Sequence, residues 1–138
     1  MKLIIVTEEA VVYEGEIDQA TFPTQIGQIT VLAGHIPLVT LVVSGEVTLV
    51  INGKPTLLAV SAGILEVRKN NELVLMADRS EFAHTIDKGR AEEAYSRAKK
   101  LLEEKTHEGD VDFVRFESQI EKELNRVRVA DKYIRHNP

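Results

Sequence analysis

The spacing of the hydrophobic residues changes near residue 85, and this change limits the folds that the chain can adopt. Up to residue 84, apolar residues come in short β-branched runs broken by turn residues, as in β-strands. From residue 85 onward they recur every three or four residues, as on one face of an amphipathic helix. We therefore expect an α+β protein, with a β-sandwich or flattened barrel over residues 1–84 and an antiparallel two-helix hairpin over residues 85–138.

The first half contains several candidate strands and two turn signals. Asn52-Gly53 follows the alternating stretch Val47–Ile51, and Asn-Gly between apolar runs is the strongest short hairpin signal because both residues tolerate positive φ. We expect Asn70-Asn71 to turn the chain in the same way. The other candidate strands are Leu3–Val6, Val11–Tyr13, Ile17–Phe22, Ile29–Leu32, Leu65–Val67 and Leu73–Met76.

Two helices are expected in the second half. Asp87 is a good N-cap for the first, Gly109 is a stop signal, and Asp110 or Asp112 can cap the second. The expected apolar stripes are Ala91, Ala94, Tyr95, Ala98, Leu101 and Leu102, and then Phe113, Phe116, Ile120, Leu124, Val127 and Ile134. Both stripes are narrow, and helices are stabilised mainly by packing such a face, so we expect a marginally stable hairpin that can move.

The composition excludes several classes of protein. The chain has no cysteine, so a disulfide framework and thiolate chemistry are excluded. Its net charge is −5, which makes non-specific binding to nucleic acid a poor fit because such binding neutralises phosphates. No apolar run approaches the roughly 18 residues of a membrane span, and Glu8 and Glu9 end the first run too early for a signal peptide. We expect a cytosolic chain that meets a membrane only through protein partners.

No catalytic or metal-binding motif is present in the sequence. Serine elbows and phosphate loops of the Walker type are missing, so neither a nucleophilic hydrolase nor a nucleotide hydrolase is expected. The histidines lack the spacing by which three or four ligands converge on zinc. They are His35, His84, His107 and His136. His35 lies between Gly34 and Pro37, and we expect it to be a turn residue that bonds nearby backbone.

Two charged groups in the second half leave alternatives open. Asp87 and Arg90 share a helix face, which Arg97 extends two turns further on. They form either an N-cap with a surface ion pair, worth about 0–1 kcal/mol, or a small anion or nucleotide site, for which an arginine fork has suitable geometry.

The basic residues of the last stretch form the second group. They are Lys122, Arg126, Arg128, Lys132 and Arg135, and Glu123 and Asp131 oppose them. This face is either solvated or docks on an acidic partner surface, where its charge would steer association.

Six short motifs occur in an order that resembles the epsilon subunit of F-type ATP synthases, over essentially the whole chain. Each is weak alone, but their order and the β-then-helical layout make the set specific. The motifs are Val12–Gly15, Gly27–Leu38 with its glycine–histidine–X–proline–leucine segment, Ser61–Val67, Met76–Asp78, Ile86–Ala91 and Asp110–Phe113.

The resemblance implies a non-catalytic rotor subunit of a proton-translocating ATP synthase of the bacterial type. Its β domain would bind the gamma subunit and the c-subunit ring, the latter through the loop that holds Gln28, Thr30, Ala33 and His35. Its helices would extend toward the alpha/beta catalytic head and inhibit ATP hydrolysis through the basic face of Lys122, Arg126, Arg128, Lys132 and Arg135. The chain would lie on the cytoplasmic face of the cell membrane, rather than at a thylakoid, as a peripheral component.

The resemblance also implies ATP as a regulatory ligand that holds the hairpin folded, with no cofactor required. The matching positions are Glu81, Asp87, Arg90, Arg97 and Arg126. A stand-alone nucleotide-sensing module that uses these residues is the alternative function. Lys122 occupies the position of a second arginine in an ATP-binding relative, and it keeps the charge but loses the bidentate fork.

The glycine–histidine loop departs from the family pattern at three positions. Gln28 replaces a frequent Glu, Thr30 a frequent Gly and Ala33 a usual Pro. A contact with the c ring would therefore be least like that of the family at these three residues.

Overall fold

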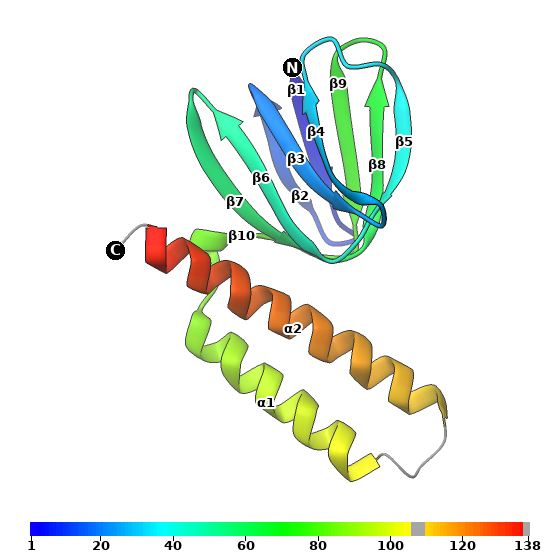
Figure 1. The fold of residues 1–138 in the computed structure, drawn as a ribbon, viewed down its shortest axis with the longest axis vertical. Helices are drawn as coiled ribbons and strands as arrows, with labels where there is room; N and C mark the ends of the chain where they lie inside the picture. The colour runs from blue at the N-terminus through cyan, green and yellow to red at the C-terminus, as the bar shows by residue number, and fades with distance from the viewer. Residues whose placement is uncertain (106–109, 137–138) are drawn as a thin grey trace. The chain divides into compact units, whose positions relative to one another are not determined.

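The computed structural model describes residues 1–105 and 110–136, with the side chains of residues 105, 110–113 and 136 left undescribed. The chain divides into two compact units, Met1–Ala83 and His84–Pro138. The first unit is built from strands and the second from helices, as Figure 1 shows. The predicted α+β fold, a β-sandwich or flattened barrel followed by a helical hairpin, is confirmed.

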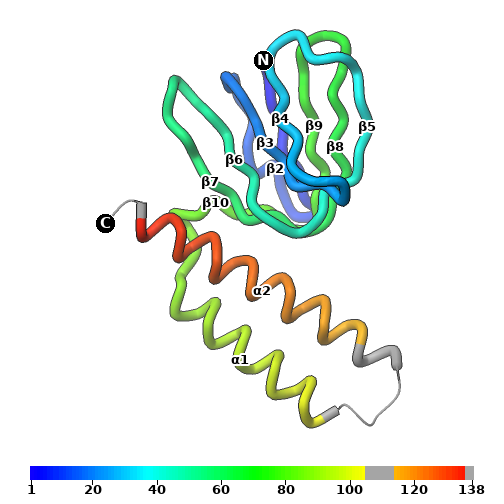
Figure 2. Tube along the Cα trace, in the orientation of Figure 1, coloured from blue at the N-terminus to red at the C-terminus, as the bar shows by residue number. Residues whose placement is uncertain are grey.

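Within the described residues, ten strands form one strongly curved sheet (Figure 2). They are β1 (Lys2–Val6), β2 (Val11–Glu16), β3 (Gln19–Thr24), β4 (Gly27–Leu32), β5 (Leu38–Val42), β6 (Gly45–Ile51), β7 (Lys54–Val60), β8 (Gly63–Arg68), β9 (Glu72–Ala77) and β10 (Ser80–Phe82). Their hydrogen-bonded order is β10-β7-β6-β3-β5-β8-β9-β1-β2, and β4 pairs with β3. Strands β1 and β9 run parallel, and the other pairs in this part of the chain are antiparallel.

The sheet curls until its two end strands meet. The rings of Tyr13 on β2 and Phe82 on β10 lie edge to face, with their centroids 6.2 Å apart. Every second residue of a strand points inward, and these mostly aliphatic side chains fill the interior around Phe22, which is fully buried. The curvature matters for function because it leaves the outward residues of neighbouring strands side by side on a convex face.

The turn at Asn52-Gly53 forms as predicted. Asn52 has φ 52° and Gly53 has φ 76°, so both residues are left-handed, as a two-residue hairpin turn requires. The turn at Asn70-Asn71 also forms, but only Asn71 has positive φ, at 63°. The carboxamide oxygen of Asn71 accepts a hydrogen bond from the backbone N–H of Gly34 at 3.0 Å, so this turn is tied to the neighbouring loop.

Three features of the strands differ from the sequence analysis. The predicted strand Ile17–Phe22 begins only at Gln19, because the backbone N–H groups of Ile17 and Asp18 bond to Met1 and Val50 instead. Strands β5 and β10 lie outside the predicted stretches. Strand β5 begins directly after the loop that holds Gly34 and Pro37, and its run of apolar residues alternates only weakly, while β10 has three residues, too few to show a period.

The second unit starts with a short 3-10 turn, Ala83–Thr85, followed by α1 (Lys88–Lys105) and α2 (Asp110–His136). Asp87 caps α1, since its Oδ1 accepts a hydrogen bond from the backbone N–H of Arg90 at 3.1 Å. This confirms the predicted N-cap. Helix α2 begins at Asp110, so Asp112 lies inside the helix, and the predicted stop at Gly109 lies outside the described residues.

The apolar stripes of the two helices are only partly as predicted. Ala91 and Ala98 are buried, but Leu101 and Ile134 are exposed by 41% and 48%. Val129 and Ala130, which the stripe on α2 did not include, are buried together with Glu123. The side-chain contact between Lys88 and Asp131 sets the antiparallel register, and the spacing within one helix cannot reveal it.

Candidate functional site

The outer face of five neighbouring strands carries a continuous row of apolar side chains. Strands β5, β8, β9, β1 and β2 are adjacent in the sheet, and their register places one outward residue of each directly beside the next. We call this set the apolar row: Leu41, Ile64, Met76, Val6 and Val11. Directly opposed side chains on one face of a sheet contact one another, so the row is one surface.

Most of the apolar row is open to solvent. Leu41 and Val11 are each 58% exposed, Met76 is 44% exposed and Ile64 is 41% exposed. Single exposed apolar residues are ordinary on a protein surface, but a contiguous set of them marks an interaction surface. The row is therefore the strongest candidate in the first unit for contact with another protein.

Polarity changes from row to row along these strands. The row beside the apolar row is mixed, with Val39 paired to Glu66 and Ile4 paired to Glu14. The third row is charged, and Arg68 lies 2.8 Å from Glu72 and 3.3 Å from Glu66. The hydrogen bond that Arg68 donates to Glu66, supported by the one it donates to Glu72, raises the pKa of Arg68 above its ordinary value. Charged side chains of the third row thus form ion pairs with one another, whereas the apolar row contains only apolar side chains.

A shallow hollow of about 540 Å³ lies beside the apolar row. Its lining includes Ile64 and Met76 from the row, together with the acidic residues Glu8 and Asp78. Gly63 also lines the hollow, and the close approach of β8 to β9 requires a glycine there, because a Cβ atom would collide with the carbonyl oxygen of Met76. An apolar surface with an acidic rim fits a partner whose apolar side chains are flanked by basic ones.

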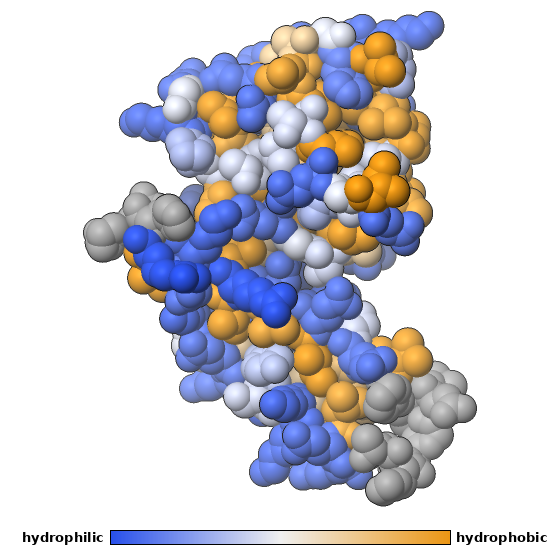
Figure 3. All heavy atoms as spheres, viewed as in Figure 1, coloured by the Kyte–Doolittle hydropathy of each residue, from blue (hydrophilic) through white to orange (hydrophobic). Residues whose placement is uncertain are grey.

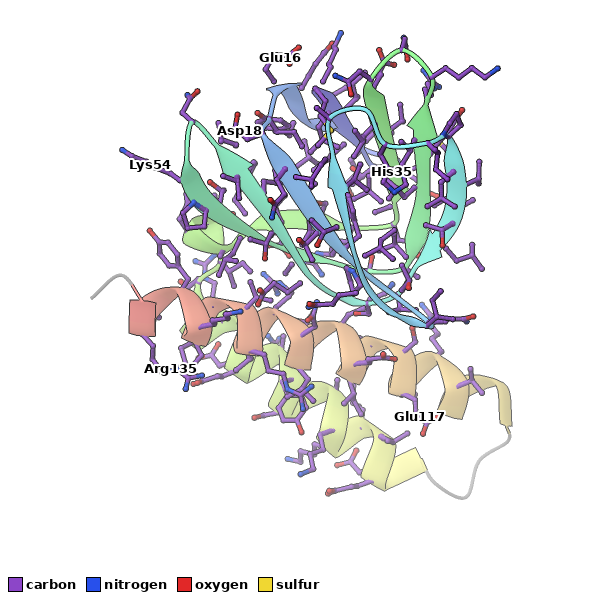
Figure 4. The ribbon with its side chains drawn as sticks, turned by 45° about the horizontal axis from the view of Figure 1, so that its top comes forward. Glu16, Asp18, His35, Lys54, Glu117 and Arg135 are labelled. Atoms are coloured by element: carbon purple, nitrogen blue, oxygen red, sulfur yellow. The ribbon has the colours of Figure 1, made fainter. Side chains whose placement is uncertain are left out.

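The residues predicted to contact the c ring lie on β4 and in the loop after it. Gln28 and Thr30 point outward from β4 and are exposed, as is Ala33 beyond its end. Thr30 shares a hydrogen bond with Thr21, with 3.0 Å between their hydroxyl oxygens. His35, labelled in Figure 4, is half-buried, and its Nδ1 lies 2.7 Å from the carbonyl oxygen of Ile36. This local backbone contact is the one expected of a turn residue.

Apolar side chains also reach the surface at the opposite end of β4. The turn between β3 and β4 is formed by Gln25 and Ile26, and Ile26 is 93% exposed. Figure 3 shows hydrophobic side chains at the surface around this turn. The turn follows the end of β3 that pairs with β5, since Thr24 lies opposite Val42, the neighbour of Leu41 in the apolar row.

The residues proposed for nucleotide binding are only partly brought together. Asp87 and Arg90 form a 3.8 Å ion pair at the start of α1, and both are largely exposed. Arg97 donates from Nε to the carbonyl oxygen of Glu93 at 3.5 Å, and it stays on the surface of the same helix. Arg126 on α2 is mostly buried and lies 2.8 Å from Glu123. Glu81 belongs to β10 in the first unit, where it pairs with Arg79 at 3.1 Å.

The basic residues of α2 do not all share one environment. Arg128, Lys132 and Arg135 are exposed and follow the i, i+4, i+7 spacing of one helix face. Arg135, labelled near the end of α2 in Figure 4, lies 2.7 Å from Asp131. Lys122 is half-buried, and Arg126 is committed to Glu123. The exposed basic face therefore consists of three residues rather than five.

In the part of the chain that the structure describes, no group of three or more His, Cys, Asp or Glu residues could hold a metal ion. His107 lies outside that part, and so does the side chain of His136. None of the helices, where described, is long and apolar enough to cross a membrane.

Sequence reasoning missed the apolar row and the buried carboxylate of Glu123. Each residue of the row sits in a different strand, so the row exists only once the register is known. Alternation at Val39 and Leu41 was a usable signal for one strand, but it does not show which strands are neighbours.

Two family models match consecutive parts of the chain. The beta-sandwich domain of the ATP synthase delta/epsilon chain matches residues 1–83, and the long alpha-helix domain of the same chain matches residues 84–131. An ATP synthase epsilon chain from Desulforamulus reducens is 40% identical over 130 residues, which cover 94% of this chain and 96% of that one. One from Bacillus licheniformis is 36% identical over 130 residues, which cover 94% and 97%.

Solved structures share the fold at lower identity. A chain in the mitochondrial ATP synthase of Euglena gracilis, solved as OSCP, F1 and c-ring, has a TM-score of 0.72 at 19% identity and covers 89% of this chain and 76% of its own. A chain of the Tetrahymena thermophila mitochondrial ATP synthase, solved as central stalk and c-ring, has a TM-score of 0.57 at 13% identity, with 95% and 93% covered.

Proposed function

The chain belongs to the ATP synthase delta/epsilon family, and from this premise we propose that it is a non-catalytic rotor subunit of a proton-translocating F-type ATP synthase. The observation that carries the proposal is the match of both family domains, in order, to nearly the whole chain. In this role the β unit couples the catalytic head to the c ring, and the helices restrain ATP hydrolysis. The chain would be held at the cytoplasmic face of the cell membrane through its partners.

The apolar row supports the gamma subunit as the main partner of the β unit. A rotor subunit must hold its neighbour firmly while torque passes through it, which calls for apolar burial rather than exposed ion pairs. The apolar row offers such a surface, and its acidic rim at Glu8 and Asp78 favours a partner surface with basic residues.

The c ring is proposed to contact Gln28, Thr30, Ala33 and His35. Gln28 and Thr30 face outward on β4, and exposed Leu32 lies between them and Ala33. With Gln28 in place of a carboxylate, this contact would rely on hydrogen bonds and apolar packing more than on charge.

The helices are proposed to inhibit hydrolysis by reaching the alpha/beta head, with Lys122, Arg126, Arg128, Lys132 and Arg135 as the basic face. Arg128, Lys132 and Arg135 are the exposed members, so they would make the first contacts with an acidic surface. Arg126 would contribute only after it separates from Glu123.

Reconstitution tests the proposal. Purified F1 that lacks its own small rotor subunit is mixed with the full chain or with a version that ends at Thr85, and ATP hydrolysis is measured. We expect the full chain to inhibit and the short version to bind without inhibiting. Equal inhibition by both versions would remove the helices from the mechanism, and failure of both to bind would contradict the rotor role.

ATP is proposed as a regulatory ligand of the folded hairpin, and stand-alone nucleotide sensing is the alternative function. The adjacent, solvent-accessible Asp87 and Arg90 favour a small anionic ligand at the start of α1. Calorimetric titration with ATP would compare Arg90→Ala with Arg115→Ala, an exposed arginine outside the proposed set. Loss of binding only in Arg90→Ala supports the site, and no heat at millimolar ATP in the unaltered chain removes it.

A further inference from the structure

The open end of the helical hairpin is held by a cluster of charged side chains from both helices. Lys88, in the first turn of α1, places its Nζ 2.9 Å from Oδ1 of Asp131 near the end of α2. Arg135, one turn further along α2, places Nη2 2.7 Å from Oδ2 of the same carboxylate. Each carboxylate oxygen of Asp131 therefore contacts a cationic side chain, Lys88 from α1 and Arg135 from α2.

An aromatic contact lies at the same end of the hairpin. The rings of His84, just before α1, and Tyr133 on α2 are tilted by 53° with their centroids 6.4 Å apart. The hydrogen bond that Lys88 donates to Asp131 lowers the pKa of Asp131 and raises the pKa of Lys88, so each group favours the charged form of the other. Two different kinds of contact thus join the same short segments, which are 43 residues apart along the chain.

The apolar seam between the helices leaves a large role to these contacts. Among the described side chains of α1, the fully buried ones are Ala91 and Ala98, whose methyl groups bury little area, while Tyr95 and Leu102 are half-buried and Leu101 is 41% exposed. Burial free energy scales with apolar area, so an alanine seam holds the helices together weakly. A modest contact across the open end then has a measurable effect on the balance between closed and open hairpins.

We propose that Lys88, Asp131 and Arg135, with His84 against Tyr133, form a clasp that sets the population of open hairpin. The inference rests on the proposed function, because it assigns to the clasp the regulation of the inhibitory helices. Opening separates α1 from α2 and breaks the contact between Lys88 and Asp131, whereas Arg135 stays paired with Asp131 within α2.

The test measures the distance between the helices in the full chain. Because the chain has no cysteine, Glu93→Cys and Glu121→Cys introduce a single pair of spin labels, both at exposed positions outside the proposed basic face. The clasp variants are Lys88→Met and Asp131→Asn, each alone and both together. Lys99→Met, an exposed lysine on the same helix, is the matched control.

Each clasp variant is expected to increase the open population by roughly two- to fivefold, the range for a partly exposed ion pair. The double variant should add little to either single variant, because both remove the same contact. One molar salt should increase the open population of the unaltered chain, and it should change the open population of the double variant much less. The proposal would be overturned if the clasp variants had the same open population as Lys99→Met. It would also be overturned if the effects of the two clasp substitutions were additive.

Inhibition of F1 by the same variants separates this proposal from the proposed function. If the clasp variants open the hairpin but no form of the chain inhibits hydrolysis, the clasp stands and the inhibitory function fails. If the unaltered chain inhibits and the clasp variants match it in both distance and inhibition, the function stands and the clasp fails.

Discussion

Single residues in this chain show how backbone geometry restricts side-chain choice. Gly63 allows β8 and β9 to approach closely, because any Cβ atom would meet the backbone of Met76 and Ala77. Gly89, in the first turn of α1, has only the tip of Asp87 at 3.4 Å, an ordinary contact distance. The same substitution should therefore have opposite effects at the two glycines.

Gly63→Ala is expected to lower the free energy of unfolding by about 1–3 kcal/mol, the usual cost of overpacking a well-packed site. Gly89→Ala is expected to raise the stability of the helical unit by up to about 1 kcal/mol, since alanine is the better helix former. Urea unfolding followed by circular dichroism measures both. A Gly63→Ala variant as stable as the unaltered chain would show that β8 and β9 can separate without loss.

At the scale of elements, local signals were predictable and pairing was not. Asn52-Gly53 and Asp87 act on backbone within a few residues, so the sequence alone located a hairpin and a helix start. The neighbours of β5, the burial of Val129 and the apolar row all depend on contacts between segments far apart in the chain. Hydrophobic spacing reports which face of an element is buried, and it does not report which element covers that face.

The packing of α1 against α2 should depend on pH through the clasp. The pKa of Asp131 is lowered in the folded state, so its contribution is present above its unfolded value of about 3.9 and is lost as pH falls through the folded pKa. The pKa of Lys88 is raised, so its contribution is present below about 10.4 and is lost as pH rises through the folded pKa. The clasp is therefore fully formed between these two limits.

Thermal unfolding of the unaltered chain and of Lys88→Met is followed by circular dichroism at 222 nm at a series of pH values. The measured quantity is the difference between the two thermal midpoints at each pH. We expect a plateau at intermediate pH that shrinks toward both extremes. Glu92 lies 3.9 Å from Nζ of Lys88 and Arg135 lies 2.7 Å from Asp131, so these charged groups also face the pair. A difference that does not vary with pH would contradict a stabilising role for the Lys88–Asp131 pair.

At the scale of the whole molecule, the two units divide the work of a rotor subunit. A well-packed barrel with a fixed outer surface suits permanent attachment, and a hairpin with an alanine seam suits a change of state. The family match covers both units, so the assignment of the fold and of the family does not depend on any single residue.

The apolar row can be tested by its effect on assembly. Ile64→Ser should leave the fold intact, because the side chain is 41% exposed, yet weaken binding to the gamma subunit by about ten- to a hundredfold, as expected for loss of a buried aliphatic side chain at about 1.5–3 kcal/mol. Ile134→Ser, the same substitution at an exposed position on α2 that belongs to no proposed contact, is the control. Titration of each variant into purified gamma subunit gives the affinities. Equal affinities would place the gamma contact elsewhere on the β unit.

The parallel pairing of β1 with β9 has a consequence for how the protein is made. Leu3 lies beside Leu73, so β1 is synthesised about 70 residues before β9 and must wait for it before one of its edges is covered. Until then the β1–β2 hairpin presents an open apolar edge, which is a template for pairing with other chains. Folding that must await such distant contacts is slow. Expression at lower temperature, where synthesis and aggregation both slow, should therefore raise the yield of soluble protein.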